Sequence, residues 1–183
     1  MTDKLICFDT DCLSSFLWVG NENLIVNLYK NHIILPKPTY DEICYVPHLK
    51  RKVDIMLSNG DLNLQMLSLG SPEFVLFNKL TAFPDVGFNT IGKGEASAIV
   101  LAKFNNGILG SNNLVDTRRF INQFHLNFIT TAGILVKAYN SGLISEAKGN
   151  GIWLSMTNRQ RKLPAVTFTD FLKSGLAKEQ YIT

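Results

Sequence analysis

Short, continuous apolar runs recur along the chain and are separated by amphipathic segments. Such runs occupy residues 5–8, 32–35, 107–111 and 126–129, and they are typical of strands buried on both faces of a sheet. The segment 62–69 alternates apolar and polar residues, which indicates a further strand nearer to a sheet edge. We expect the run at 126–129 to be the last strand.

The segments between these runs carry apolar residues at helical spacing. Ser71 followed by Pro72 marks one helix start, because Ser caps helices well and Pro is tolerated in the first turn. Apolar periodicity predicts other helices around 13–17 and 24–29, and then over 95–104, 132–140, 144–154 and 166–172.

Strands that alternate with helices predict βαβ units, and therefore an α/β fold with a mostly parallel sheet and helices on both faces. We interpret residues 1–183 as a single domain, because no repeat or linker interrupts the pattern. Ligands of such sheets bind beyond the carboxyl ends of the strands. Asp9, Asn112 and Thr130 all follow predicted strands, so we expect them on one rim.

Composition excludes several classes of protein. Hydrophobic residues make up 46% of the 183 residues and charged residues 18%, which is ordinary for a globular protein. The net charge of +3 permits a nucleic-acid partner without requiring one. Three cysteines with no CxxC pair predict neither a disulfide framework nor a zinc site. With no apolar segment near the roughly 20 residues of a membrane span and no signal-peptide core, we expect a cytoplasmic protein without membrane contact.

Four carboxylates, Asp9, Glu42, Glu95 and Asp116, lie at the edges of different predicted elements. Acids spread in this way can converge at one end of a parallel sheet. Converging carboxylates bind hard divalent cations, which activate water and offset the charge of a phosphate. The sequence therefore favours a metal-dependent phosphodiesterase.

Two of the acids in this region also admit structural roles. Thr39 and Glu42 have the spacing of a capping box, so that Glu42 is either a site residue or a cap of its own helix. Asp11 either caps the helix after the first strand or belongs to the site.

Several motifs in order resemble the PIN-domain family of metal-dependent nucleases. They lie at 6–10, where Ile-Cys-Phe-Asp-Thr occurs, at 40–43, at 94–99 with Gly-Glu-Ala-Ser-Ala-Ile, at 108–113 and at 130–138. The last stretch, with Gly-Leu-Ile at 142–144, is similar to a bacterial and archaeal subgroup in which many members are toxins of toxin–antitoxin pairs.

The resemblance implies a three-layer α/β/α sandwich that depends on Mg²⁺ or Mn²⁺ and cleaves RNA. It implies Asp9, Glu95 and Asp116 as metal ligands, with Glu42 acting through or orienting a water. It also implies a homodimer and, for a toxin, a small antitoxin protein that covers the acidic rim.

The chain departs from the family pattern at Asn112 and Asn113, where an acid is usual. The lost charge predicts weaker metal binding or a single metal. Asn112, Asn113, Thr130 and Arg118 are candidate contacts to substrate, although Thr130 is equally suited to cap a helix and Arg118 to lie in solvent. The basic turn 159–162 has the same two interpretations, phosphate contact or solvated surface.

Two alternatives remain open. The stretch 9–13 comes close to the start of haloacid dehalogenase-like phosphatases, in which the first Asp is a nucleophile, but Leu13 stands where Thr or Val is needed. A PIN fold that binds RNA or protein without cutting is the other, and Asn112 and Asn113 motivate it.

Overall fold

A single twisted sheet forms the centre of the computed structural model, which describes residues 4–175 and 181–182. The ends of the predicted domain 1–183 therefore lie outside the described residues. Among these, six strands follow the order β3-β2-β1-β4-β5-β6. Their bounds are β1 Ile6–Phe8, β2 Ile33–Pro36, β3 Asn63–Gln65, β4 Ile108–Gly110, β5 Asn127–Ile129 and β6 Tyr181–Ile182. All neighbours pair in parallel except β5 and β6, so the expected mostly parallel sheet is confirmed.

The inner strands β1, β2 and β4 are buried on both faces, as their continuous apolar runs predict. Ile6 and Phe8 point into one core and Cys7, between them, into a second core on the opposite face. The same alternation separates Ile108 from Leu109 in β4. Because successive side chains of a strand point to opposite faces, a strand that is buried on both faces must be apolar at each position.

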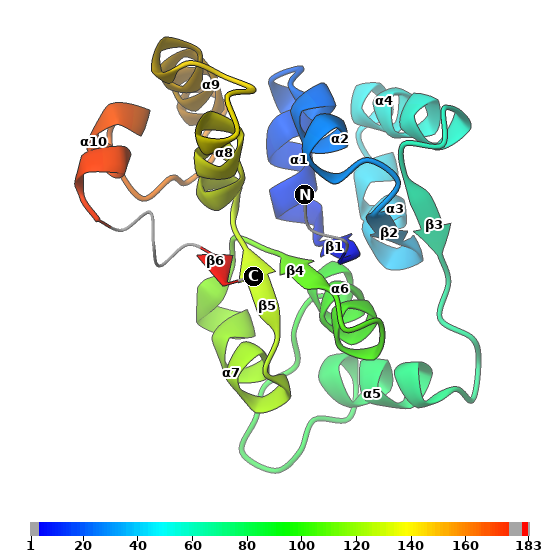
Figure 1. Cartoon of the computed structure of the whole chain (residues 1–183). Helices are drawn as coiled ribbons and strands as arrows, with labels where there is room; N and C mark the ends of the chain where they lie inside the picture. The colour runs from blue at the N-terminus through cyan, green and yellow to red at the C-terminus, as the bar shows by residue number, and fades with distance from the viewer. Residues whose placement is uncertain (1–3, 176–180, 183) are drawn as a thin grey trace.

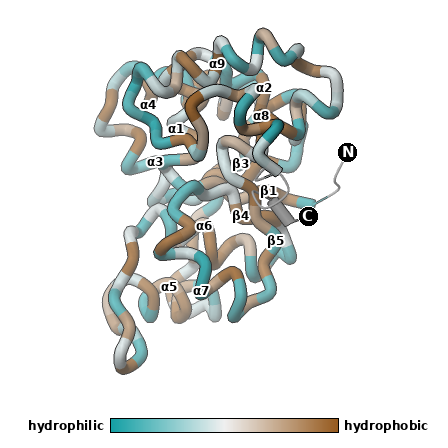
Figure 2. The backbone as a smooth tube through the Cα atoms, turned by 90° about the vertical axis from the view of Figure 1, so that its left-hand side faces the viewer, coloured by the Kyte–Doolittle hydropathy of each residue, from teal (hydrophilic) through white to brown (hydrophobic). Residues whose placement is uncertain are grey.

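One helical layer packs on the face reached by Ile6 and Phe8. It contains α1 Thr10–Trp18, α2 Glu22–Tyr29, α4 Pro47–Ser58, α8 Thr131–Asn140, α9 Glu146–Asn158 and α10 Phe168–Lys173. The opposite layer contains α5 Pro72–Thr81, α6 Lys93–Phe104 and α7 Leu114–Phe124. Figures 1 and 2 show the two layers on either side of the sheet. The remaining helix, α3 Lys37–Cys44, packs against both α4 and α6. The three-layer α/β sandwich is confirmed.

Three predictions about local structure were wrong. The strand expected over 62–69 is limited to β3, although it does lie at a sheet edge. The run at 126–129 is not the last strand, because β6 adds an antiparallel edge. Thr39 is no N-cap: α3 begins before it at Lys37, and its buried hydroxyl donates to the backbone oxygen of Phe8. No helix among the described residues is long and apolar enough to cross a membrane.

Candidate active site

Asp9 follows β1 directly and is 1% exposed. Its Oδ1 accepts a hydrogen bond from the backbone N–H of Cys12, 2.7 Å away, so that Asp9 is the N-cap of α1. Its Oδ2 is also buried and makes no hydrogen bond of good geometry among the described residues, and the same holds for Oγ of Ser111, although that hydroxyl is close enough to lower the pKa of Asp9. A buried carboxylate oxygen without a partner is costly, and a bound cation is one way to offset that cost.

The environment of Asp9 disfavours its charged form. The pKa of Asp9 is raised to about 7, mainly by burial and to a smaller extent by the carboxylates of Asp11 and Glu95, whereas the Ser111 hydroxyl and the Cys12 amide lower it. A carboxyl group held in this way gains from a positive partner, because a nearby cation stabilises the ionised form.

Glu42 lies on α3 but holds the start of α6. Its Oε1 accepts from the backbone N–H of Gly94 at 2.9 Å, and its Oε2 accepts from the Thr10 hydroxyl. The N-cap position of α6 is Gly92, which has no side chain to cap the helix. The capping-box alternative for Glu42 is therefore wrong, because Glu42 caps a helix other than its own.

An amide group joins Glu95 to Asp116. Asn113 Nδ2 donates to Glu95 Oε1 and to Asp116 Oδ2, each at 2.7 Å. Asn113 is also the N-cap of α7, because its Oδ1 accepts from the Asp116 N–H. Asn113, one of the two residues that depart from the family pattern, thus connects two of the predicted acids.

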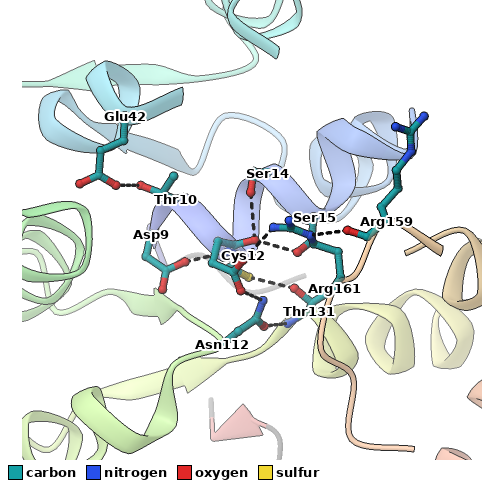
Figure 3. A network of polar contacts seen from close by, with 11 residues as sticks. Asp9, Thr10, Cys12, Ser14, Ser15, Glu42, Asn112, Thr131, Arg159 and Arg161 are labelled. Atoms are coloured by element: carbon teal, nitrogen blue, oxygen red, sulfur yellow. Dashed lines mark hydrogen bonds and ion pairs between the residues drawn. The ribbon is translucent and has the colours of Figure 1, made fainter. Parts of the chain in front are cut away.

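The second asparagine links the N-terminal ends of α1 and α8. Asn112 Nδ2 donates to Asp11 Oδ2 at 2.9 Å, and its Oδ1 accepts from the Thr131 N–H at 2.8 Å. Asp11 also pairs with Arg161, whose Nη1 lies 3.1 Å from Asp11 Oδ1. Figure 3 shows Asn112 directed toward Thr131 in this network. Asp11 does not cap α1, since Asp9 does.

A cavity of about 350 Å³ brings three of the four predicted acids together. Asp9, Glu42 and Glu95 line it, whereas Asp116 is connected to it through Asn113. In the described part of the chain, no three His, Cys, Asp or Glu side chains form a ready metal-binding group. Asp9 and Glu95 suit a single hard cation, because Mg²⁺ is often held by one or two carboxylates and keeps several waters.

The two remaining candidate contacts to substrate, Thr130 and Arg118, lie in different environments. Thr130 is the N-cap of α8, with its hydroxyl accepting from the Gly133 N–H. Arg118 is exposed on α7, and its substrate role stays a prediction. The carboxyl ends of β1, β4 and β5 share one edge, so the common rim of Asp9, Asn112 and Thr130 is confirmed.

Sequence reasoning missed several residues of the cavity. Thr10 and Ser14 line it, as do Gly92 and Gly94. Arg161 was not missed: it belongs to the basic turn 159–162, a candidate phosphate contact, and it lines the cavity too. Contacts between segments so distant in sequence leave no local pattern.

In a comparison with protein families, a family model described as PIN domain matches residues 5–174. No curated protein and no solved structure matches the chain. PIN domains are generally nucleases and usually use divalent metals. The family match leaves the phosphatase alternative without support. With nearly all of its length matched and an acid-lined cavity at the carboxyl end of its sheet, this chain belongs to the PIN-domain family.

Proposed function

We propose that the protein is a metal-dependent endoribonuclease that hydrolyses RNA phosphodiester bonds in the cavity of Asp9, Glu42 and Glu95. The observation that carries the proposal is the buried carboxylate of Asp9, whose Oδ2 makes no hydrogen bond of good geometry among the described residues and which lines the same cavity as Glu95. Burial here disfavours an ionised carboxylate on its own. A cation bound at this position would stabilise the carboxylate and could also contact a phosphate.

Asp9 and Glu95 would hold Mg²⁺ or Mn²⁺. When bound, the cation supplies Lewis-acid stabilisation of the phosphate and makes water a better nucleophile. Asp116 supports this pair, because the amide of Asn113 fixes its carboxylate relative to Glu95. Its role as a third ligand stays a prediction.

Glu42 acts in this proposal as a positioning residue. Both of its oxygens accept hydrogen bonds, one from α6 and one from Thr10 in α1. It therefore fixes the start of α6 next to Glu95, while the N-terminal end of the helix favours negative charge nearby. The orientation of an attacking water by Glu42 is part of the same proposal.

The choice of RNA as substrate is supported by the resemblance to PIN-domain ribonucleases and is compatible with the net charge of +3. An antitoxin partner, a homodimer and a cytoplasmic location stay predictions of the same kind.

Cleavage of a mixed RNA pool tests the function. We expect fragments with Mg²⁺ or Mn²⁺ and intact RNA with EDTA. Fragments that persist at full rate in EDTA would contradict a metal-dependent mechanism.

A non-catalytic binding module is the second candidate, and the amide of Asn113 between Glu95 and Asp116 favours it. An amide that already satisfies both carboxylates reduces their need for a metal. Thermal unfolding with Mn²⁺ separates the candidates, because selective binding to the folded state raises the melting temperature. An unchanged melting temperature at millimolar Mn²⁺ favours the binding module.

A further inference from the structure

Backbone hydrogen bonds at the C-terminal end of α9 fix the position of the Arg161 backbone. The backbone N–H of Arg161 donates to the Met156 oxygen and that of Gln160 to the Thr157 oxygen. Gln160 has a positive φ of 59°, and this combination is a Schellman motif, which closes a helix and reverses the chain. The position of the Arg161 backbone is therefore set by the helix end.

The side chain of Arg161 brings positive charge to the acid cavity. Among the described residues that line it, four are carboxylates, Asp9, Asp11, Glu42 and Glu95, and Arg161 is the one cation. A phosphodiester that enters this cavity meets repulsion from the acids. The cation at its wall offsets part of that repulsion, in addition to any bound metal.

The contacts of Arg161 leave room for a ligand. Its Nη1 pairs with Asp11, and its Nε donates to the Arg159 oxygen at 3.3 Å. Its Nη2 makes no hydrogen bond within the described part of the chain. The pair with Asp11 is partly exposed, with side-chain exposures of 28% for Arg161 and 55% for Asp11. Such a partly exposed ion pair contributes little to stability, so a phosphate can compete for the guanidinium at little cost.

We propose that Arg161 binds a phosphate of the RNA substrate at the wall of the acid cavity, with Asp11 holding the guanidinium in place when RNA is absent. The proposal rests on the proposed function for the identity of the ligand. A planar guanidinium suits this role because its N–H groups match two phosphate oxygens.

The neighbouring basic residues differ from Arg161 in their contacts. The guanidinium of Arg159 lies over the Trp18 ring, 5.6 Å from its centre, and Lys162 is exposed. Neither lines the cavity. Lys162 therefore provides a matched control, because it carries the same charge in the same turn.

The test measures the affinity for a short fluorescent single-stranded RNA by anisotropy, in the Asp9→Asn background to prevent cleavage. Arg161→Gln should weaken binding about ten-fold, as expected for a charge-assisted hydrogen bond. It should also reduce the salt dependence by about 0.7 in the log–log slope, the value for one phosphate contact on a single strand. Lys162→Gln should leave both quantities nearly unchanged.

The Asp11→Asn variant distinguishes a direct phosphate contact by Arg161 from a purely structural role of the Arg161–Asp11 ion pair. It breaks the same ion pair but removes a negative charge, so RNA affinity should not fall. Equal losses in Arg161→Gln and Asp11→Asn would show that Arg161 acts only through the pair, and equal losses in Arg161→Gln and Lys162→Gln would show diffuse attraction. Either result overturns the proposal. If Arg161→Gln does not fold, Arg161→Lys replaces it. A smaller loss of RNA affinity is then expected, because Lys keeps the positive charge but lacks the paired N–H groups of the guanidinium.

The anisotropy assay requires no cleavage, so the nuclease activity and the Arg161 phosphate contact can be contradicted independently of each other. Affinity that depends on Arg161 without cleavage by the wild type would overturn the nuclease alone. Cleavage by the wild type with affinity that is independent of Arg161 would overturn the phosphate contact alone.

Discussion

The carboxylate of Glu42 accepts a hydrogen bond from the backbone N–H of Gly94, 2.9 Å away, across 52 positions of sequence. This contact lets an acid of α3 cap α6 where Gly92 offers no side chain. Because Gly94 directly precedes Glu95, the contact also brings Glu42 to the turn of α6 that carries Glu95. One hydrogen bond therefore stabilises the helix and holds two acids of the cavity together.

Gly94→Ala should destabilise the protein. A Cβ on Gly94 would lie 2.6 Å from both Glu42 Oε2 and Thr10 Oγ1, so these side chains must move and the cap is lost. We expect a decrease of about 1–2 kcal/mol in the free energy of unfolding, measured with urea.

Gly151→Ala is the matched control in α9, since a Cβ there meets nothing within 4 Å. It should stabilise the protein by about 0.5–1 kcal/mol, the usual gain of Ala over Gly in a helix. Effects of the same sign in both variants would refute the role of Gly94.

Asp9→Asn should stabilise the metal-free protein at neutral pH. The pKa of Asp9 is raised from 3.8 to about 7, so the folded protein binds more protons than the unfolded chain between these values. The stability of the wild type therefore falls as pH rises through this window, by at most about 4 kcal/mol. The neutral Asn avoids this loss.

Urea unfolding of both proteins in EDTA across this pH range measures the difference. The advantage of Asp9→Asn should be largest above pH 7 and vanish near pH 4. An advantage that is constant with pH, or that grows in acid, is incompatible with a buried ionised Asp9.

Asn113→Asp should strengthen metal binding and weaken the metal-free fold. It replaces the donor shared by Glu95 and Asp116 with a third negative charge, which costs about 1–2 kcal/mol in EDTA. The added charge should raise Mn²⁺ affinity about ten-fold in calorimetric titration, because ligand charge tunes such sites.

Asn113→Ala separates the two effects of that change, since it removes the same donor without adding charge. Its metal-free fold should also be weakened, but its Mn²⁺ affinity should stay near that of the wild type. If the Asp and Ala variants bind Mn²⁺ equally, charge at this position does not control the site.

The sheet and its rim could be predicted because their signals are local. Continuous apolar runs identify β1, β2, β4 and β5, and parallel pairing then places Asp9 and Asn112 on one edge. β6 escaped prediction, because a two-residue strand has no periodicity to detect.

The contacts inside the site could not be predicted, because they join distant segments. Thr39 and Glu42 show the spacing of a capping box, yet Pro36 precedes a helix that starts at Lys37, and both side chains contact other elements instead. Arg161 reaches Asp11 across 150 positions through the geometry of a helix end, which no motif encodes.

The most direct test of the central claim is the rate at which a labelled RNA is cleaved with saturating Mn²⁺ by the wild type, Asp9→Asn and Asp61→Asn. Asp61 lies outside the cavity, so its variant controls for the loss of a charge. We predict that Asp9→Asn remains folded and loses about a hundred-fold or more in rate, whereas Asp61→Asn cleaves like the wild type. Cleavage by folded Asp9→Asn at the wild-type rate would contradict the assignment of the active site.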